Sequence, residues 1–272
     1  MSKNSLSNVE CWSVVSEGYE QTTMNFLSQY SESAITLSTE KTNANVLDLA
    51  CGPGTLARLL YKRVGSITAV DFSENMIHLL NHFIQNKKIN NITTLVGDGQ
   101  ALNLSSSQFS HVFSMFGLMF FPDRRKGFSE SYRLLRPDGE LIVSSWAPIK
   151  QSPAMELMFG LISAISPNAT ESKSSVTNLE DPINFKKEFE DAGFSNIIIQ
   201  PVTHELEISS IDEFWVDMVK GSAPIAFLKK STTIQEWKVI EQKGLAYLKT
   251  VLSHLPNRLS ADAWIGKGEK LS

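Results

Sequence analysis

The chain has 272 residues, of which 42% are hydrophobic and 20% charged, and its formal net charge is -4 at pH 7. This length allows one large domain, or a core with an elaborated cap. The slight acidity disfavours a nucleic-acid-binding protein, which needs a basic face. The two cysteines, Cys11 and Cys51, exclude a disulfide-rich scaffold and are too few for a structural zinc site.

The sequence has no signature of export or of membrane insertion. Its first residues lack the apolar core of a signal peptide, and no apolar run is long enough to cross a bilayer. Its low cysteine content is typical of a reducing compartment, so we predict a cytoplasmic protein without stable membrane insertion. The oligomeric state does not follow from the sequence.

From Asn45 to Ala147, short apolar strands alternate with amphipathic helices. The expected strands are Val46–Leu49, Ser66–Val70, Asn91–Val96, His111–Phe116 and Glu140–Trp146. The expected helices are Thr55–Arg63, Ser73–Asn86 with Ser73 as a suitable N-cap, and Arg124–Leu135, which a turn over residues 136–139 would close. This alternation predicts a parallel sheet with helices on both faces and right-handed crossovers.

After Pro148 the alternation is lost. Helices are expected over Ala154–Ile165, Phe185–Ala192, Ile211–Val219 and Thr233–Leu255, and strands over Ser195–Gln200, Val202–Ile208 and Ala261–Lys267. The segment Ser166–Asp181 is rich in Ser, Thr and Asn and is expected to be a mobile loop. Together the two halves predict a Rossmann-like, doubly wound α/β fold with a mostly parallel, seven-stranded sheet and helical cap insertions.

The segment VLDLACGPGTL, residues 46–56, places an acid and two glycines between a strand and a helix. Gly52, Gly54 and Ala57 fit the G-x-G-x-x-A pattern of dinucleotide-binding proteins, and Asp71 lies where their ribose-binding acid is expected. The helix after such a turn receives a pyrophosphate, which a carboxylate at Asp48 would repel. S-adenosylmethionine carries a sulfonium and an ammonium but no phosphate, so the acid favours the methyl donor.

Five segments occur in a recognisable order: VLDLACGPGTLA, ITAVDFSENMI, VGDGQAL, FGLMFFPD and SYRLLRPDGELIVSSW. Together they resemble the class I S-adenosylmethionine-dependent methyltransferases, in particular the methyltransferase type 11 branch similar to ubiquinone/menaquinone-biosynthesis C-methyltransferases. The resemblance is strong over residues 19–146 and extends to the remainder only in layout. The chain departs from the common pattern at Phe109-Ser110, where Phe-Asp is frequent, and at Pro137-Asp138-Gly139, where Pro-Gly-Gly is frequent.

The resemblance implies a helical lid over residues 1–40, an S-adenosylmethionine-binding core over 41–150, and late strands with a substrate cap over 151–272. It implies that Asp48 contacts the methionine ammonium or organises its site, that Asp71 accepts the ribose hydroxyls, and that Asp98 accepts the adenine amino group. The expected cofactor-binding residues are Tyr19, Asp48, Ala50, Gly52, Gly54, Asp71, Phe72, Met76, Gly97, Asp98, Gly99, Phe116, Gly117 and Phe121.

Most of these residue roles have structural alternatives: an ordinary tight turn for Gly52 and Gly54, a turn-capping acid for Asp48, and an N-cap for Asp71. Met76 is equally suited to plain core packing, and Asp98 to a solvated loop. Tyr19, like the nearby Trp12, belongs either to a lid over the cofactor or to a surface helix. Methyl transfer needs alignment and exclusion of water, and some acceptors also need a base. No motif identifies that base, although His204 and His254 lie in the half of the chain that could reach a substrate chamber.

Apolar residues of the second half would line such a chamber: Trp146, Met155, Met158, Phe159, Phe214, Trp215, Met218 and Phe227. They predict that the methyl acceptor is a small apolar or aromatic molecule. No group of residues has the spacing of a metal site, so no metal ion is expected. Two alternatives stay open. One is an NAD-dependent oxidoreductase, against which Asp48 argues, and the other is a protein that binds S-adenosylmethionine without catalysis.

Overall fold

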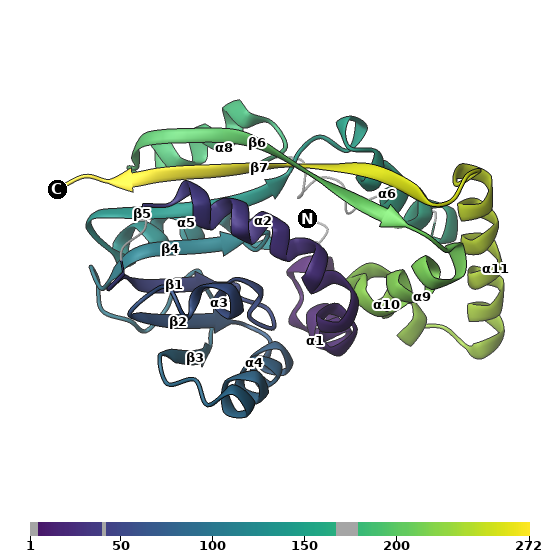
Figure 1. Ribbon diagram of the computed structural model, residues 1–272, viewed down its shortest axis with the longest axis horizontal. Helices are drawn as coiled ribbons and strands as arrows, with labels where there is room; N and C mark the ends of the chain where they lie inside the picture. The colour runs from purple at the N-terminus through teal and green to yellow at the C-terminus, as the bar shows by residue number, and fades with distance from the viewer. Residues whose placement is uncertain (1–4, 40–41, 167–178) are drawn as a thin grey trace.

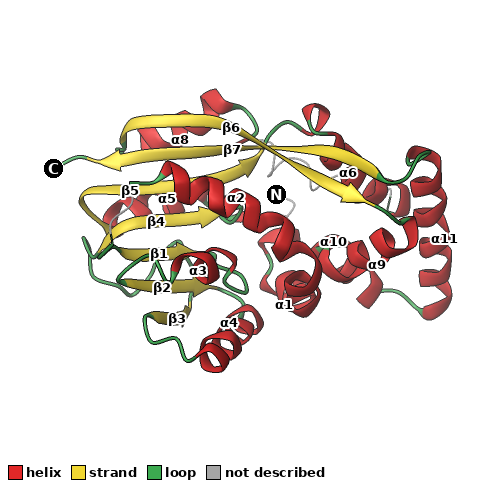
Figure 2. Ribbon diagram, viewed as in Figure 1, coloured by secondary structure: helices red, strands yellow, loops and turns green. Residues whose placement is uncertain are grey.

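The computed structural model describes residues 5–39, 42–166 and 179–272 (Figures 1 and 2). Within these residues, seven strands form one sheet in the order β3-β2-β1-β4-β5-β7-β6. Their bounds are β1 Asn45–Leu49, β2 Ser66–Asp71, β3 Ile92–Val96, β4 Phe109–Met115, β5 Leu135–Trp146, β6 Ser195–Ile208 and β7 Asn257–Lys270. Neighbours among β1 to β5 are parallel, and β7 is antiparallel to both β5 and β6. The doubly wound, mostly parallel, seven-stranded sheet is therefore confirmed.

Helices cover both faces of the sheet. Their bounds are α1 Val9–Gly18, α2 Met24–Leu37, α3 Thr55–Leu60, α4 Glu74–Lys87, α5 Arg124–Leu134, α6 Pro153–Ile165, α8 Pro182–Asp191, α9 Ile211–Gly221, α10 Ala223–Lys230 and α11 Ile234–Val251. In Figure 1, α2 and α3 lie in front of the sheet, whereas α5 and α8 lie behind it. The remaining late helices, α9, α10 and α11, extend beyond the end of the sheet that carries the site described below.

Two hydrophobic clusters fill the layers on either side of the sheet. One contains Phe128 of α5 with Phe185 and Phe189 of α8, all fully buried. The other joins α3 and α4 to the strands and contains Leu56 and Leu80. A third cluster lies between α6, α9 and α11 and gives the late helices a small core of their own. None of the described helices combines the length and apolar character that are needed to span a bilayer.

Residues 136–139 were expected to form a turn, but in the structure they belong to a strand. Residues Leu135–Trp146 form one strand, because Leu135 already pairs with Phe109 of β4. The ladder changes register between Phe109 and His111, so an irregularity inside the strand replaces the turn. Asp138 adopts the left-handed region there, with φ of 59°, which a short polar side chain tolerates.

Other differences concern the second half. The two strands expected over residues 195–208 are one strand, β6, which continues through Pro201. Because β6 is the edge strand of the sheet, a missing N–H is tolerated there. Helix α10 was not expected, although Ser222 and a proline in its first turn are typical of a helix start. Most of the expected loop Ser166–Asp181 lies outside the described residues.

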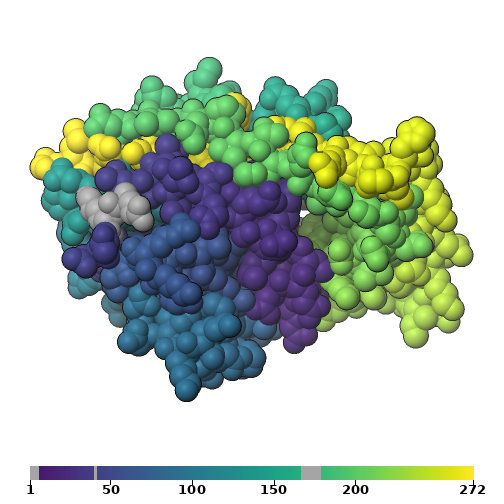
Figure 3. Space-filling model, in the orientation of Figure 1, coloured from purple at the N-terminus to yellow at the C-terminus, as the bar shows by residue number. Residues whose placement is uncertain are grey.

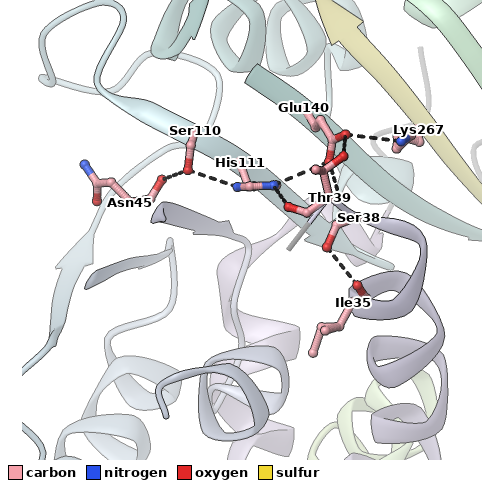
Figure 4. A network of polar contacts seen from close by, with 8 residues as sticks. All are labelled: Ile35, Ser38, Thr39, Asn45, Ser110, His111, Glu140 and Lys267. Atoms are coloured by element: carbon pink, nitrogen blue, oxygen red, sulfur yellow. Dashed lines mark hydrogen bonds and ion pairs between the residues drawn. The ribbon is translucent and has the colours of Figure 1, made fainter. Parts of the chain in front are cut away.

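A buried polar network fastens the chain after α2 to the sheet (Figure 4). The backbone N–H of Thr39 donates to Glu140 of β5 at 2.8 Å. The same carboxylate lies 3.4 Å from Nε2 of His111 and 3.1 Å from Nζ of Lys267. Burial alone would raise the pKa of Glu140, but bonds from His111, Thr39 and Lys267 hold it well below its ordinary value. Ser110 also donates to the carbonyl of Asn45, 3.1 Å away.

Candidate cofactor site

The turn after β1 depends on backbone conformations that glycine adopts easily. Gly52 and Gly54 have φ of 55° and 87°, and Ala50 has φ of 58°. A Cβ at Gly54 would lie 2.4 Å from Cδ1 of Leu80, so α4 packs directly against the turn. A Cβ at Gly52 would meet nothing within 4 Å. The backbone of Gly52 is therefore open toward the space beside the sheet.

Asp48 lies beneath this turn, and its side chain is almost completely buried. Its Oδ2 accepts a hydrogen bond from the backbone N–H of Ala57, 3.2 Å away, in the first turn of α3. Burial raises the pKa of Asp48 to about 7; the bond from Ala57 opposes this rise and the charge of Asp71 adds to it. The acid thus organises the glycine turn and places negative charge below it, but it does not line the cavity described next.

Asp71 joins the end of β2 to two backbone segments. Its Oδ2 accepts the N–H of Gly52 at 2.8 Å, and its Oδ1 accepts the N–H of Ser73 at 2.9 Å. Burial raises the pKa of Asp71 to about 6, against the lowering effect of these bonds. Ser73 is the N-cap of α4, as expected, with its Oγ accepting the N–H of Met76 at 3.4 Å. The acid is therefore fixed at the edge where β1 and β2 end.

A cavity of about 380 Å³ lies over this edge. It receives all but two of the residues expected to bind a cofactor; the exceptions are Asp48 and Gly54, which support the turn from below. The expected residues that line it are Tyr19, Ala50, Gly52, Asp71, Phe72, Met76, Gly97, Asp98, Gly99, Phe116, Gly117 and Phe121. The sequence motifs, which are separated by tens of residues, thus converge on one space.

Glycines narrow this space. A Cβ at Gly99 would lie 2.7 Å from Cζ of Phe121 and 2.8 Å from Cδ1 of Leu49. A Cβ at Gly117 would lie 2.5 Å from that of Ala50. Since real Cβ atoms do not approach so closely, the walls meet only because these positions carry no side chain. The result is a slot whose shape suits a flat ring system.

Several lining residues were missed by the sequence reasoning. Leu6, Ser7, Thr23, Phe26, Leu27, Gln100 and Pro122 also border the cavity. Tyr19, Thr23, Phe26 and Leu27 are spaced by four, seven and eight positions, which is one face of a helix. This periodicity was readable in the sequence, but only the fold shows that the face points toward the cavity.

Aromatic rings form the walls of the cavity. Trp146 stacks on Phe116 with ring centroids 4.2 Å apart, and Tyr30 meets both rings edge-on. On the N-terminal side, Trp12 packs on Phe120 with centroids 5.2 Å apart and on Tyr19 at 6.2 Å. Figure 3 shows the purple N-terminal segment between the blue core and the green late helices. Trp12 and Tyr19 both line the cavity.

The apolar residues expected to form a chamber in the second half border the cavity only in part. Of these residues, Trp146 and Met158 line the cavity. Trp215 and Met218 are buried in the cluster between α6, α9 and α11, because they pack that helical unit together. His204 also lies away from the cavity, with Nε2 3.1 Å from Oγ of Ser33.

The charge of the cavity decides which ligand class fits. Its lining, over the described residues, includes Asp71 and Asp98 and no lysine, arginine or histidine. Asp98 is exposed at the rim, and its Oδ1 accepts the backbone N–H of Gln100 at 3.0 Å. With Asp48 beneath the turn, the site attracts a cation and offers no counter-charge to a pyrophosphate. The donor set and the narrow slot therefore fit S-adenosylmethionine better than a dinucleotide.

Comparisons with known proteins agree with this geometry. A methyltransferase domain family matches residues 46–139. The chain is 29% identical over 169 residues to the methyltransferase tpcH of Aspergillus fumigatus. The aligned region covers 58% of this chain and 59% of tpcH, which is less than two thirds of the length of tpcH. The chain is 30% identical over 177 residues to the demethylmenaquinone methyltransferase of Staphylococcus saprophyticus, and the aligned region covers 60% of this chain and 75% of that protein.

Solved structures share the fold at low identity. The phosphoethanolamine N-methyltransferase 2 of Haemonchus contortus, in complex with S-adenosylmethionine, superposes with a TM-score of 0.56 at 17% identity, over 90% of this chain and 53% of that one. The [4+2]-cyclase SpnF superposes with a TM-score of 0.58 at 12% identity, over 90% and 82%. The order of motifs, the sheet and these relatives together show that the chain belongs to the class I S-adenosylmethionine-dependent methyltransferases.

Proposed function

We propose that this chain transfers a methyl group from S-adenosylmethionine to a small apolar or aromatic acceptor. The observation that carries the proposal is the cavity at the ends of β1, β2, β4 and β5, whose charged lining side chains, among those described, are acids. When bound there, S-adenosylmethionine supplies an electrophilic methyl group on a sulfonium. The residues of the chain would bind the donor, align the acceptor and exclude water.

On this proposal the two ends of the donor have separate partners. Asp71 receives the ribose hydroxyls, and Asp98 with Gly99 receives the adenine. Phe72 and Met76 flank that ring. The amino-acid part lies against the glycine turn, at Ala50 and Gly52, under Tyr19. Phe116, Gly117 and Phe121 then border the methyl group. The arrangement is supported by the convergence of all these residues on one cavity.

The acceptor would lie on the opposite side of the cavity. Phe26, Trp146 and Met158 are apolar, and the hydroxyl of Thr23 is the polar group beside them. Such a wall favours a flat, largely apolar molecule, because polar groups lose hydration when they are buried without partners. The similarity to a demethylmenaquinone methyltransferase supports the same class of acceptor. We also propose a cytoplasmic location, which suits the low cysteine content of the chain.

Calorimetric titration followed by a turnover assay tests the proposal. The purified chain should bind S-adenosylmethionine and S-adenosylhomocysteine with micromolar Kd and should not bind NAD. It should then form S-adenosylhomocysteine with 1,4-naphthohydroquinone or a simple phenol, and not with phosphoethanolamine, the polar control. Binding of NAD alone would contradict the cofactor, and turnover confined to phosphoethanolamine would contradict the acceptor class.

One alternative, binding without methyl transfer, is favoured by a specific observation. The described lining residues on the acceptor side include no histidine or carboxylate that could serve as a base. In addition, the neighbour SpnF is named a cyclase. A chain that binds S-adenosylmethionine tightly but leaves it unconsumed across phenols, hydroquinones and fatty acids would support this alternative instead.

A further inference from the structure

Helices α1 and α2 are joined by a π-helical turn, Tyr19–Thr23, that borders the cavity. The backbone stays in the right-handed helical region on both sides, with φ of -65° at Gly18 and -58° at Met24. A π-turn inserts one residue into the helical repeat and is uncommon outside functional sites. Here it lies where Tyr19 and Thr23 both enter the cavity wall.

One side of this turn is held by an ion pair to the helix that follows the glycine turn. Glu20 pairs with Nη2 of Arg58 on α3, and the two side chains are 29% and 15% exposed. The guanidinium also lies over the ring of Phe83 on α4, 4.4 Å from its centroid. A cation this buried is costly without its partner. Arg58 therefore fixes the place of Glu20.

The other side of the turn is held by the end of α9. A Cβ at Gly18 would lie 2.1 Å from the carbonyl oxygen of Lys220, and one at Gly221 would lie 2.2 Å from Oγ1 of Thr22. Thr23 donates from Oγ1 to the carbonyl of Gly221 at 3.3 Å. The two backbones thus meet without intervening side chains. The turn has little freedom to move toward α9, so its position depends on the contact with α3.

The first turn of α3 connects this contact to the cofactor side. Gly54 is the N-cap of α3, Asp48 accepts the N–H of Ala57, and Arg58 is the next residue. Across the cavity, burial and then the negative charge of Asp71 raise the pKa of Tyr19. Tyr19 and Asp71 both line the cavity, as do Ala50 and Gly52, against which the amino-acid part of the donor would lie.

We propose that Glu20 and Arg58 are positioning residues, which hold the π-turn against α3 so that Tyr19 covers the amino-acid part of the bound donor. This inference rests on the proposed function, because it assigns the role toward S-adenosylmethionine. Without the pair, the turn keeps its contact with α9 but is no longer tied to α3, so Tyr19 loses its fixed place over the site. Ligands that have an amino-acid part then lose their contact with Tyr19. Ligands that lack this part do not make the contact, so their binding should not change.

The chain contains a matched control. Glu32 and Arg63 pair at 3.0 Å between α2 and the residues just after α3, and their side chains are 44% and 41% exposed. This pair also joins the N-terminal helices to the region of α3, and neither of its residues lines the cavity. An exposed pair contributes little. Glu32→Gln should therefore leave ligand binding unchanged.

The test compares two ligands by calorimetry on the full chain: S-adenosylhomocysteine, and 5′-methylthioadenosine, which lacks the amino-acid part. Glu20→Gln and Arg58→Lys should each raise the Kd for S-adenosylhomocysteine by about tenfold. The Kd for 5′-methylthioadenosine should rise by less than about twofold. Glu32→Gln should change neither Kd. The exchange of charges, Glu20→Arg with Arg58→Glu, should restore part of the lost affinity if the pair acts as a unit.

Each outcome is decisive. Equal weakening of both ligands, or weakening in proportion to a lower Tm, would show a structural role and overturn the positioning role. Unchanged Kd values in Glu20→Gln would overturn it as well. If the unchanged chain binds neither ligand, the proposed function fails instead. Arg58→Lys keeps the positive charge, so the ligand comparison remains available if removal of Glu20 prevents folding.

Discussion

Asp71 accepts a hydrogen bond from the backbone N–H of Gly52, 2.8 Å away, although the two residues belong to different strand ends. The bond ties the carboxylate that we assign to the ribose to the turn that we assign to the methionine part. A change at Asp71 therefore acts on both halves of the site. It should alter binding more than a change at the exposed Asp98, which bonds only within its own loop.

We predict that Asp71→Ala weakens binding of S-adenosylmethionine by about 1–3 kcal/mol, because the ribose hydroxyls lose a charged acceptor. Asp71→Asn keeps one acceptor oxygen and should lose less. Calorimetry at pH 7.5 measures both, and circular dichroism checks that each variant is folded. Unchanged affinity in a folded Asp71→Ala variant would remove Asp71 from the site.

The affinity for S-adenosylmethionine should rise with pH. Burial raises the pKa of Asp71 to about 6 and that of Asp48 to about 7. As pH increases through this range both acids ionise, and the cavity attracts a cation more strongly. We expect binding to tighten by about threefold to tenfold between pH 5.5 and 7.5. S-adenosylhomocysteine, which has no sulfonium, should change less.

The same two acids should affect stability in the opposite direction. A carboxyl group whose pKa is higher in the folded protein than in the unfolded chain favours folding in its protonated form. The free energy of unfolding should therefore fall as pH rises from about 4 to about 7 on their account. Asp48→Asn removes one of them, and denaturant unfolding at pH 5 and pH 8 should show a smaller fall. An equal fall would show that Asp48 does not titrate in this range.

Gly99→Ala should damage the narrow slot. The new Cβ would lie 2.7 Å from Cζ of Phe121 and 2.8 Å from Cδ1 of Leu49, so one of these side chains must move. Overpacking of this kind costs about 1–3 kcal/mol. We expect adenosine to bind about tenfold more weakly, and Phe121→Leu in the same variant to restore part of the loss. Binding that is no weaker than in the unchanged chain would argue against a slot closed by these walls.

Glu140→Gln should separate stability from binding. Glu140 lies in the middle of β5, whereas the cavity lies at the carboxyl ends of the parallel strands. Loss of a buried partner of His111 and Lys267 should lower the free energy of unfolding by about 3 kcal/mol. Because the pKa of Glu140 is depressed, its stabilising contribution should also disappear on acidification below about pH 4.5. The Kd for S-adenosylhomocysteine, measured well below Tm, should not change.

The sequence was most informative where local chemistry restricts the backbone. A strand, an acid and two glycines predict the turn at Gly52, and Asp71 follows because β2 must end beside it. Asp48 shows the limit of this reasoning. Its charge favours a cation, but only the fold shows that its carboxylate lies beneath the turn and accepts the N–H of Ala57.

The second half was less predictable, because its apolar residues have several possible partners. Trp215 and Met218 have the same character as Trp146 and Met158, yet the first pair fills a helical core and the second borders the cavity. Periodicity identifies a buried face but not what covers it. The contact between Gly18 and Lys220 is likewise invisible in the sequence, because it joins residues far apart along the chain.

The antiparallel strand β7 has a consequence for synthesis. It lies between β5 and β6 in the sheet, although both of those strands precede it along the chain. During translation β5 and β6 emerge first and cannot pair with each other in their final places. A nascent chain that ends before Asn257 therefore presents an unpaired β5 edge, which is a template for aggregation. We expect ribosome-bound intermediates of this protein to need chaperone protection until residues 257–270 have emerged and inserted.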